Sequence, residues 1–431
     1  MAAMGEVSTM SPAPGAIAPA HQQTAMTMYP HLRGKRVAIV VLSGYPSDSR
    51  PVRAATAFVA QGMKVDYLCL SEYGAPLREK TDGLDVTRLR FTHRRGGKLG
   101  YIWEYSWCTT AMAALLAKRI LRHRYDLVYI NNMPEVLVAS ALIPKLMGAK
   151  VILDMHDPMP ELMTTIFQLP EDSFALRLLK WLEKWSMARA NLVLTVNIAC
   201  ERMFGARSCS PDKLAVVMNS PDGNVFPYRV PNASTSMDKK SERPFVVMYH
   251  GSLLARNGVD LAVDAVAKVR ERIPSIVLRI YGDRCAFLDR VMAGVRERGL
   301  DGTVQYLGPK TLQEIVTEIE DCDVGVIPNH RNAFTEINTP TRIFEYLATG
   351  KPVIAPSTSG ITDYFGDDSL VFFEAGDADD LARRIEYVAT HREEALRITE
   401  RGQEVYLAHT WEREREVLAR VVSDLLRSEP A

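Results

Sequence analysis

The chain has 431 residues, of which 47% are hydrophobic and 24% charged, and its formal net charge is zero. This length suits two to three domains of about 100–200 residues each. The six cysteines are scattered without a C-x-x-C pair, which argues against a disulfide framework or a zinc knuckle and suits a reducing compartment. No apolar run approaches the roughly 20 residues of a membrane span, and residues 1–35 lack the basic start and apolar block of a signal peptide. We therefore expect a cytoplasmic protein rather than a secreted, transmembrane or fibrous one.

Apolar segments followed by polar loops predict parallel strands in the first half of the chain. Val37–Ser43 and Lys64–Leu70 are buried-strand candidates on either side of a helix through Ala54–Gln61. The same pattern of a strand before a polar loop recurs at Leu127–Ile130, Lys150–Met155, Leu192–Asn197 and Lys213–Met218. Residues 36–226 are thus predicted to form a doubly wound, Rossmann-like α/β domain, with a disordered tail at residues 1–35.

The first half is also the basic half. Residues 1–230 carry 27 Lys/Arg against 19 Asp/Glu, whereas residues 231–431 carry 25 against 33. Cations alternate with aromatic rings over residues 93–107, HRRGGKLGYIWEYSW. Such a mixture suits contact with an anionic membrane surface, and an aromatic helix packed into the core is the alternative. Because no nucleic-acid motif is present and the pI is 7.1, we expect no nucleic-acid partner.

A polar, proline-bounded segment at residues 227–244 predicts an interdomain linker. The α/β alternation restarts after it and predicts a second Rossmann-like domain over residues 245–408. Trp411–Leu426 has apolar side chains at helical spacing, so we expect residues 409–431 to form a helix that packs back on the first domain. The predicted fold class is α/β, with two doubly wound domains facing each other across a cleft.

The segment Asn338–Pro356, NTPTRIFEYLATGKPVIAP, has the pattern of an anion site at the start of a helix. Thr339 can cap a helix whose first turn holds Pro340, which leaves the N–H groups of Thr341 and Arg342 free. These N–H groups and the Arg342 charge would attract a phosphate, and Glu345, one turn further, could accept both hydroxyls of a ribose. An ordinary capped helix with a solvated Glu345 is the alternative.

Other polar residues also follow predicted strands, where open α/β sheets bind ligands. His156 and Asp157 follow one strand, although a single histidine there is more often a satisfied polar residue than a catalyst. Asp48, Arg50 and Arg53 follow the first strand and could contact an acceptor or a departing phosphate, or form a capped turn with exposed charges. Asp321 and Asp323 form a D-x-D pair directly before a strand, where a turn or cap is the better interpretation, so we predict no metal.

Several motifs together resemble glycosyltransferase family 4, the retaining, nucleotide-sugar-dependent family with the GT-B fold. The run TPTRIFEYLATGKPVIAP resembles its donor-site signature, and YHGSLLARNGVDLAVDAV (Tyr249–Val266) resembles its phosphate-binding loop. The segments LRIYGD, VQYLG and DCDVGVIPN resemble those that follow in the family. SGYPSDSRPVRAATAFVAQG, NNMPE and VILDMHD are similar to its acceptor-domain loops.

The resemblance implies a role for individual residues. Glu345 would hold the ribose, Leu307 and Gly308 the base, and His156 would face the sugar at the reaction centre. The diphosphate loop would contain Gly251, Ser252, Arg256 and Asn257, and Asn338, Thr339 and Thr341 would complete the donor site. The resemblance is imperfect at three positions: Ile337 replaces the usual glutamate, with Glu336 beside it, and Ser252 and Asn257 replace an arginine and a lysine. Arg256 and Arg342 are the expected replacements for this lost positive charge.

We therefore expect a retaining, metal-independent glycosyltransferase without a cofactor, acting in polysaccharide or glycoconjugate biosynthesis. It would transfer a hexose or N-acetylhexosamine from a nucleotide-diphosphate sugar to a hydroxyl of a saccharide or lipid-linked acceptor. His156, Arg256 and Arg342 are the expected catalytic residues, and Asp48, Arg50, Arg53 and Asp157 the expected acceptor contacts. A nucleotide-sugar epimerase and a non-catalytic nucleotide-sugar binding protein are the alternatives.

Overall fold

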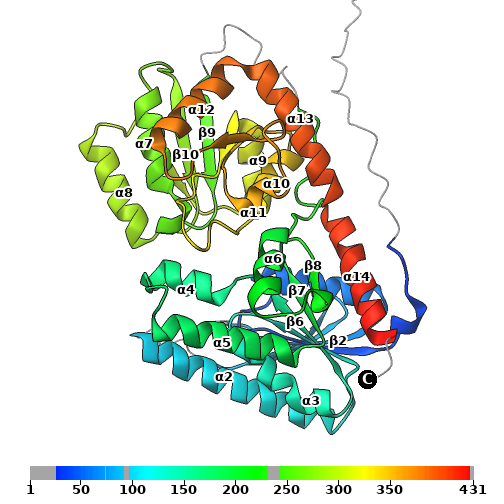
Figure 1. Ribbon diagram of the computed structural model, residues 1–431. Helices are drawn as coiled ribbons and strands as arrows, with labels where there is room; N and C mark the ends of the chain where they lie inside the picture. The colour runs from blue at the N-terminus through cyan, green and yellow to red at the C-terminus, as the bar shows by residue number, and fades with distance from the viewer. Residues whose placement is uncertain (1–25, 73, 92–96, 232–242, 428–431) are drawn as a thin grey trace, which may run out of the picture.

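Two parallel sheets, each covered by helices on both faces, make up the protein (Figure 1). The computed structural model describes residues 26–72, 74–91, 97–231 and 243–427. The first sheet has the order β3-β4-β2-β1-β5-β6-β7-β8, and in it only the pairing of β3 with β4 is antiparallel. Its strands are β1 (Arg36–Val40), β2 (Lys64–Leu70), β3 (Arg78–Thr81), β4 (Leu84–Leu89), β5 (Leu127–Asn131), β6 (Lys150–Met155), β7 (Leu192–Thr195) and β8 (Leu214–Val216).

Successive side chains of β1 enter different cores, because neighbouring side chains of a strand point to opposite faces. Val37 and Ile39 pack in a core with α1 (Ser49–Ala60) and α14 (Trp411–Arg427). Ala38 and Val40 pack in a core with α2 (Gly97–Ile120), α5 (Phe174–Arg189) and α6 (Ile198–Arg207). The short helices α3 (Leu142–Leu146) and α4 (Met159–Phe167) lie against α2 and α5. Burial on both faces explains why the strands are nearly continuous apolar runs.

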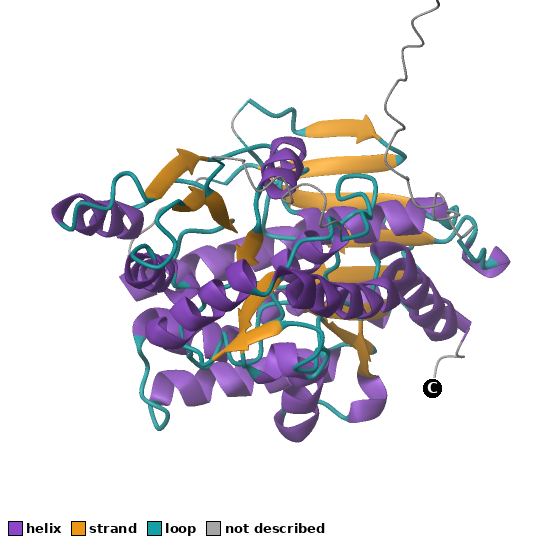
Figure 2. Ribbon diagram, turned by 90° about the horizontal axis from the view of Figure 1, so that it is seen from above, coloured by secondary structure: helices purple, strands orange, loops and turns teal. Residues whose placement is uncertain are grey.

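The second sheet has the order β11-β10-β9-β12-β13-β14 and is parallel throughout. Its strands are β9 (Phe245–His250), β10 (Ile276–Tyr281), β11 (Val304–Gly308), β12 (Val324–Val326), β13 (Val353–Pro356) and β14 (Val371–Phe373). One face is covered by α7 (Val259–Val269), α8 (Ala286–Glu297) and α12 (Ala378–Thr390), and the other by α9 (Leu312–Asp321), α10 (Thr341–Ala348), α11 (Ser359–Thr362) and α13 (Arg392–Ala408). Figure 2 shows the helices of both domains in purple and their strands in orange.

The predicted two-domain α/β fold is confirmed, and β2 and β6 have the predicted bounds. The start of α1 was predicted too late. The helix begins at Ser49 because Asp48 is its N-cap residue and accepts a hydrogen bond from the backbone N–H of Arg50 at 3.3 Å. Arg50 therefore lies in the first helical turn rather than in a loop.

The prediction of a disordered tail up to residue 35 is wrong for residues 26–35, and residues 1–25 lie outside the described part of the chain. Leu32 is fully buried in the first domain, and Tyr29 packs against the same core. The backbone N–H of Thr27 donates to Glu416 Oε1 of α14 at 2.7 Å. Apolar anchors thus tie this segment down.

The predicted boundary at residue 226 also lies too late. Met218 and Phe226 are buried in the core of the second domain, and the Arg229 N–H donates to the Ala348 carbonyl at 2.8 Å. The first domain therefore ends soon after β8. Of the predicted linker, residues 232–242 are outside the described residues.

The C-terminal helix returns to the first domain, as the sequence predicted. In Figure 1, α13 and α14 run from the second domain down along the first. Leu418 and Val422 of α14 are buried in the core shared with α1. α14 therefore links the two domains a second time.

We expect Leu418→Ala to lower the free energy of unfolding by about 2–5 kcal/mol, because it leaves a cavity in this core. Urea unfolding followed by circular dichroism measures the change. Arg420→Ala, an exposed change on the same helix, should stay within about 0.5 kcal/mol of the wild type. Equal effects of the two variants would contradict the assigned packing of α14.

Candidate functional site

Several contacts between the domains come from loops at the carboxyl ends of strands, where a ligand site was expected. After β7, Asn197 Nδ2 donates to the Ile337 carbonyl at 2.8 Å and to Thr339 Oγ1 at 3.0 Å. After β8, the Asn219 carbonyl accepts from Thr341 Oγ1 at 3.1 Å. The start of α10 therefore lies at the interface of the two domains.

Thr339 does not cap α10 as predicted. The N-cap residue is Pro340, and no side chain caps this end of the helix. The Thr339 hydroxyl donates instead to the Gly360 carbonyl, which fixes the loop that precedes the helix. The positive end of α10 is thus left without an oxygen from the protein's own side chains, in keeping with an anion site.

Arg342 connects α10 to the predicted phosphate loop. Its Nη1 donates to the His250 carbonyl at 2.8 Å, and its guanidinium lies 4.6 Å from the centre of the Tyr249 ring. The adjoining Gly251 has φ +116°, and a Cβ there would lie only 3.1 Å from Arg342 Nη1. The positive φ favours glycine here, and a Cβ would push Arg342 Nη1 back slightly.

The rest of the loop is held by its own hydrogen bonds. The Ser252 carbonyl accepts from Asn257 Nδ2 and from the Tyr249 hydroxyl, both at 2.7 Å. Arg256 lies in a single turn of 3₁₀ helix, Ala255–Asn257, with its guanidinium 5.4 Å from the centre of the Phe334 ring. The loop thus presents Arg256 beside a ring rather than beside an acid.

Three half-buried arginines at this interface share the absence of a carboxylate partner. In the described part of the chain, Arg53, Arg256 and Arg342 have no carboxylate within ion-pair distance. Burial and the neighbouring Arg50 cation lower the pKa of Arg53 to about 10. Burial also lowers the pKa of Arg256, although Asp157 opposes this shift. Buried charges are normally paired, so these three indicate a site for an anionic ligand.

Glu345 has a partner that the sequence analysis missed. Its Oε2 lies 2.6 Å from His250 Nε2, so the alternative of a solvated Glu345 is wrong. The Glu345 side chain is only 15% exposed. The signal for His250 was its place within YHGSLLARNG, the start of the segment that resembles the family's phosphate-binding loop.

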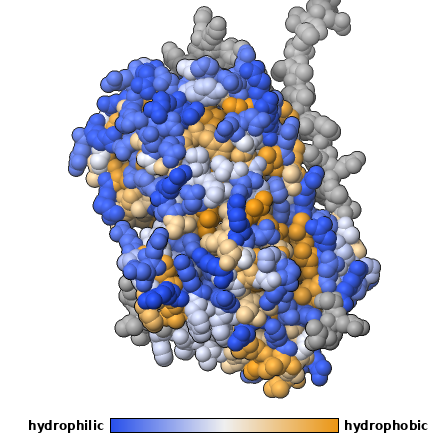
Figure 3. All heavy atoms as spheres, in the orientation of Figure 1, coloured by the Kyte–Doolittle hydropathy of each residue, from blue (hydrophilic) through white to orange (hydrophobic). Residues whose placement is uncertain are grey.

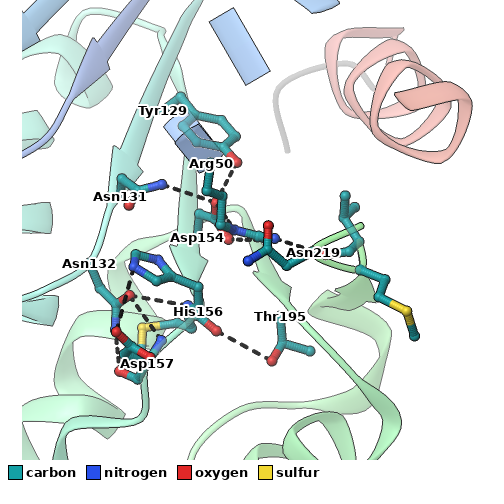
Figure 4. A network of polar contacts seen from close by, with 12 residues as sticks. Arg50, Tyr129, Asn131, Asn132, Asp154, His156, Asp157, Thr195 and Asn219 are labelled. Carbon is teal, nitrogen blue, oxygen red and sulfur yellow. Dashed lines mark hydrogen bonds and ion pairs between the residues drawn. The ribbon is translucent and has the colours of Figure 1, made fainter. Parts of the chain in front are cut away.

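On the first domain, His156 lies in a turn that Asn132 holds in place (Figure 4). Asn132 Oδ1 accepts from the His156 N–H at 3.1 Å, and its Nδ2 donates to the Asp157 carbonyl at 2.6 Å. His156 Nδ1 is buried without a hydrogen-bond partner in the described structure, and Nε2 lies 3.9 Å from Asp157 Oδ2. Asn132 was not among the predicted site residues, although it belongs to NNMPE, the segment that follows the predicted strand Leu127–Ile130.

Arg50 does not face a ligand as predicted, because its guanidinium is used inside the first domain (Figure 4). It is 8% exposed, donates to both carboxylate oxygens of Asp154 at 2.7 and 2.8 Å, and donates to the Val217 carbonyl at 3.1 Å. Arg50 keeps the pKa of Asp154 below its usual value although burial opposes this. Asp48 serves as a helix cap, as the alternative interpretation had it, but the Arg50 charge is buried and paired rather than exposed.

The remaining predicted donor residues are spread around the second domain. Leu307 is exposed and Gly308 has φ +79° at the end of the edge strand β11, while Asn338 is half-buried before α10. The Ile337 side chain packs against the core of the first domain. The neighbouring Glu336 accepts from the Ser359 N–H at 3.1 Å and pairs with Arg331 at 3.4 Å.

The D-x-D residues serve structural roles. Asp321 pairs with Arg279 at 2.6 Å, and Asp323 Oδ2 accepts from the Val246 N–H at 2.7 Å. Within the ranges that the structure describes, no cluster of three or more His, Cys, Asp or Glu could hold a metal ion.

Two family models match the chain, one over each domain. "Glycosyl transferase 4-like domain" matches residues 48–220, and "Glycosyl transferases group 1" matches residues 234–405. The chain belongs to the family 4 (group 1) glycosyltransferases. The resemblance of its motifs is thereby confirmed over both halves.

Curated relatives and solved structures agree with this assignment. D-inositol 3-phosphate glycosyltransferase of Corynebacterium aurimucosum is 25% identical over 45% of this chain and 48% of its own length. Probable glycosyltransferase WbjE of Pseudomonas aeruginosa is 23% identical over 55% of this chain and 58% of its own length. The match thus spans about half the length of these relatives.

Among solved structures, sucrose-phosphate synthase of Thermosynechococcus elongatus has a TM-score of 0.72 at 17% identity, covering 91% of this glycosyltransferase and 99% of that chain. Anabaena HepE, in complex with UDP and glucose, has a TM-score of 0.67 at 15% identity, covering 90% and 100%. These likenesses show that the fold is GT-B.

We expect inorganic pyrophosphate to bind between Arg53, Arg256 and Arg342. Arg256→Gln should weaken that binding about tenfold, the effect of losing one charge-assisted hydrogen bond. Because no ion pair is broken, stability without ligand should stay within about 0.5 kcal/mol. Isothermal titration calorimetry in metal-free buffer tests both proteins. Arg272→Gln, which breaks an exposed pair with Glu386, is the control, and an unchanged pyrophosphate affinity in Arg256→Gln would exclude Arg256 from the site.

Proposed function

We propose that this protein is a retaining glycosyltransferase that moves a hexose or N-acetylhexosamine from a nucleotide-diphosphate sugar to an acceptor hydroxyl. It needs neither a metal nor another cofactor, and it acts in polysaccharide or glycoconjugate biosynthesis. The observation that carries the proposal is that Arg53, Arg256 and Arg342 gather at one interface with no carboxylate within ion-pair distance in the described residues. A departing diphosphate gains negative charge in the transition state, and fixed cations stabilise it there.

The donor lies on the second domain in this proposal. The start of α10 and the loop from Gly251 to Asn257 hold the diphosphate, Glu345 holds the ribose, and the backbone at Leu307 and Gly308 contacts the base. HepE, which shares the fold, was solved with UDP and glucose. A UDP-sugar is therefore the first donor to test.

The acceptor lies on the first domain, near His156 and Asp157. The hydrogen bonds of Asn132 fix the backbone of this turn, so the imidazole can donate to the sugar without a large loss of entropy. Positioning and neutralisation of the diphosphate account for catalysis, and His156 acts as a donor to developing charge rather than as a proton carrier.

We expect Glu345→Ala to weaken binding of the cognate nucleoside diphosphate by about 1–3 kcal/mol, the size of a lost charge-assisted hydrogen bond. A thermal-shift panel of UDP, GDP and ADP identifies the base, and calorimetry gives the dissociation constants. Glu336→Ala removes a nearby carboxylate that bonds Ser359, and it should leave the nucleotide affinity unchanged.

Unchanged affinity in Glu345→Ala would refute the ribose assignment. Turnover assays separate the wider alternatives. Conversion of a nucleotide sugar without any acceptor would favour an epimerase, and nucleotide binding without turnover on any acceptor would favour a binding protein.

We further propose that the first domain contacts the cytoplasmic face of an anionic membrane, where a lipid-linked acceptor would be presented. Of the window 93–107, residues 93–96 lie outside the described part, but Trp103 is 69% exposed and Trp107 is 37% exposed and stacks on Phe91. The alternative of a fully core-packed aromatic helix therefore does not hold for Trp103. No helix in the described residues has the length and hydrophobicity to cross a bilayer.

Helix α5 covers the same face of the first sheet as α2 and also exposes apolar side chains. Phe174, Leu178 and Trp181 form an exposed apolar stripe at helical spacing, and the exposed cations Arg177, Lys180 and Lys184 flank it. Figure 3 shows hydrophobic residues in orange at the lower left and the bottom of this domain, over the adjoining ends of α4 and α5 and over α3. Apolar side chains beside cations fit the headgroup region of anionic lipids.

We expect Trp103→Ser combined with Trp181→Ser to reduce binding to phosphatidylglycerol vesicles at least about tenfold, because two exposed anchors are lost. Vesicle flotation measures the bound fraction, and neutral phosphatidylcholine vesicles should bind less of the wild type. Leu312→Ser removes an exposed apolar side chain from the second domain and serves as the control. Equal binding of all variants would exclude this surface.

A further inference from the structure

His250 lies between two residues of the donor site. It ends β9, is 5% exposed, and follows Tyr249 directly before the phosphate loop. Its ring Nε2 lies 2.6 Å from Glu345 Oε2, and its backbone carbonyl accepts from Arg342 Nη1 at 2.8 Å. One residue of the sheet therefore contacts both the carboxylate and the guanidinium that α10 supplies.

The other side of the His250 ring is fixed as well. Its Nδ1 lies 2.9 Å from the Tyr346 hydroxyl oxygen, and that hydroxyl donates to the Met248 carbonyl at 2.9 Å. A tyrosine hydroxyl has one hydrogen, so its oxygen accepts from Nδ1–H. His250 then also donates to Glu345 as an imidazolium, with an N–H on both ring nitrogens. The two rings also pack edge to face with centroids 4.9 Å apart. The backbone of β9 thus orients the imidazole through Tyr346.

We propose that His250 is a positioning residue that holds Glu345 for the ribose hydroxyls of the donor nucleotide. This inference rests on the proposed function. A carboxylate offers about four lone-pair sites, and His250 uses one of them on Oε2. In the described structure Oε1 accepts no hydrogen bond, so it and the rest of Oε2 are available to two neighbouring hydroxyls. A fixed carboxylate loses less conformational entropy on binding than a free one.

Two substitutions separate this role from a merely structural one. His250→Gln keeps an N–H donor near the place of Nε2, toward Glu345, and loses the contact with Tyr346. His250→Asn keeps a donor near the place of Nδ1, toward Tyr346, and loses the contact with Glu345. Each variant removes one of the two ring contacts, so thermal melting without ligand serves as a matched control for folding.

The decisive readout is discrimination for ribose. UDP, GDP and ADP are screened, and the one that binds is compared by calorimetry with its 2′,3′-dideoxy counterpart. We expect His250→Asn to bind the ribonucleotide about tenfold more weakly and the dideoxynucleotide within about twofold of the wild type, because only the hydroxyl contacts are lost. His250→Gln, which keeps the donor toward Glu345, should retain most of the wild-type preference for the ribonucleotide over the dideoxynucleotide.

Three results would overturn the proposal. Equal weakening of both nucleotides in both variants would make His250 a structural residue only. Unchanged ribose discrimination in His250→Asn, with binding still weakened by Glu345→Ala, would refute the positioning role and leave the proposed function intact. No nucleotide binding by the wild type would refute the proposed function, and the positioning role with it.

Discussion

The relative placement of the two domains depends on hydrogen bonds to one short segment, Val217–Ser220, which we call the junction segment. It leaves the first sheet after β8 and enters the second domain. Four elements bind it. Arg50 and Arg53 of α1 and Thr341 of α10 donate to it. The Glu414 carboxylate of α14 accepts from the Met218 N–H at 2.7 Å, and the His409 carbonyl in the loop before α14 accepts from the Ser220 hydroxyl. The Met218 N–H and the carbonyls of Val217, Asn219 and Ser220 thus have partners from distant parts of the chain.

These contacts explain why cations gather in the first domain near its carboxyl edge. Arg50 is neutralised by Asp154 and holds the Val217 carbonyl. Arg53 donates to Asn219 and Ser220, and its guanidinium lies 5.3 Å from the centre of the Trp411 ring. Its charge is held beside the site by neutral acceptors, so its field remains available to a ligand. The same arginine therefore orders the junction segment and contributes to the anion site.

Local sequence predicted the strands well and the helix ends less well. A strand buried on both faces is mostly apolar, so β2, β6 and β10 are visible in a short window although each also contains a charged residue. The start of α1 depends on a single capping bond from Asp48, which the following apolar residues do not reveal. That error had a chemical consequence, because a loop arginine at position 50 would face solvent, whereas a first-turn arginine meets Asp154 of β6. The partners are 104 residues apart, and no pattern in the sequence relates them.

In the candidate site, too, the sequence predicted which segments come together but not the contacts between distant residues. Motif spacing correctly brought Arg342, Glu345 and the loop after Gly251 toward one another, because a parallel sheet gathers the loops that follow its strands. The pairing of Glu345 with His250 joins residues 95 positions apart, and it depends on the Tyr346 hydroxyl reaching the Met248 carbonyl. Each of these residues alone has an ordinary structural explanation. Only their common geometry turns a helix carboxylate into a fixed acceptor. That geometry is set by the packing of α10 against β9 rather than by any one residue type.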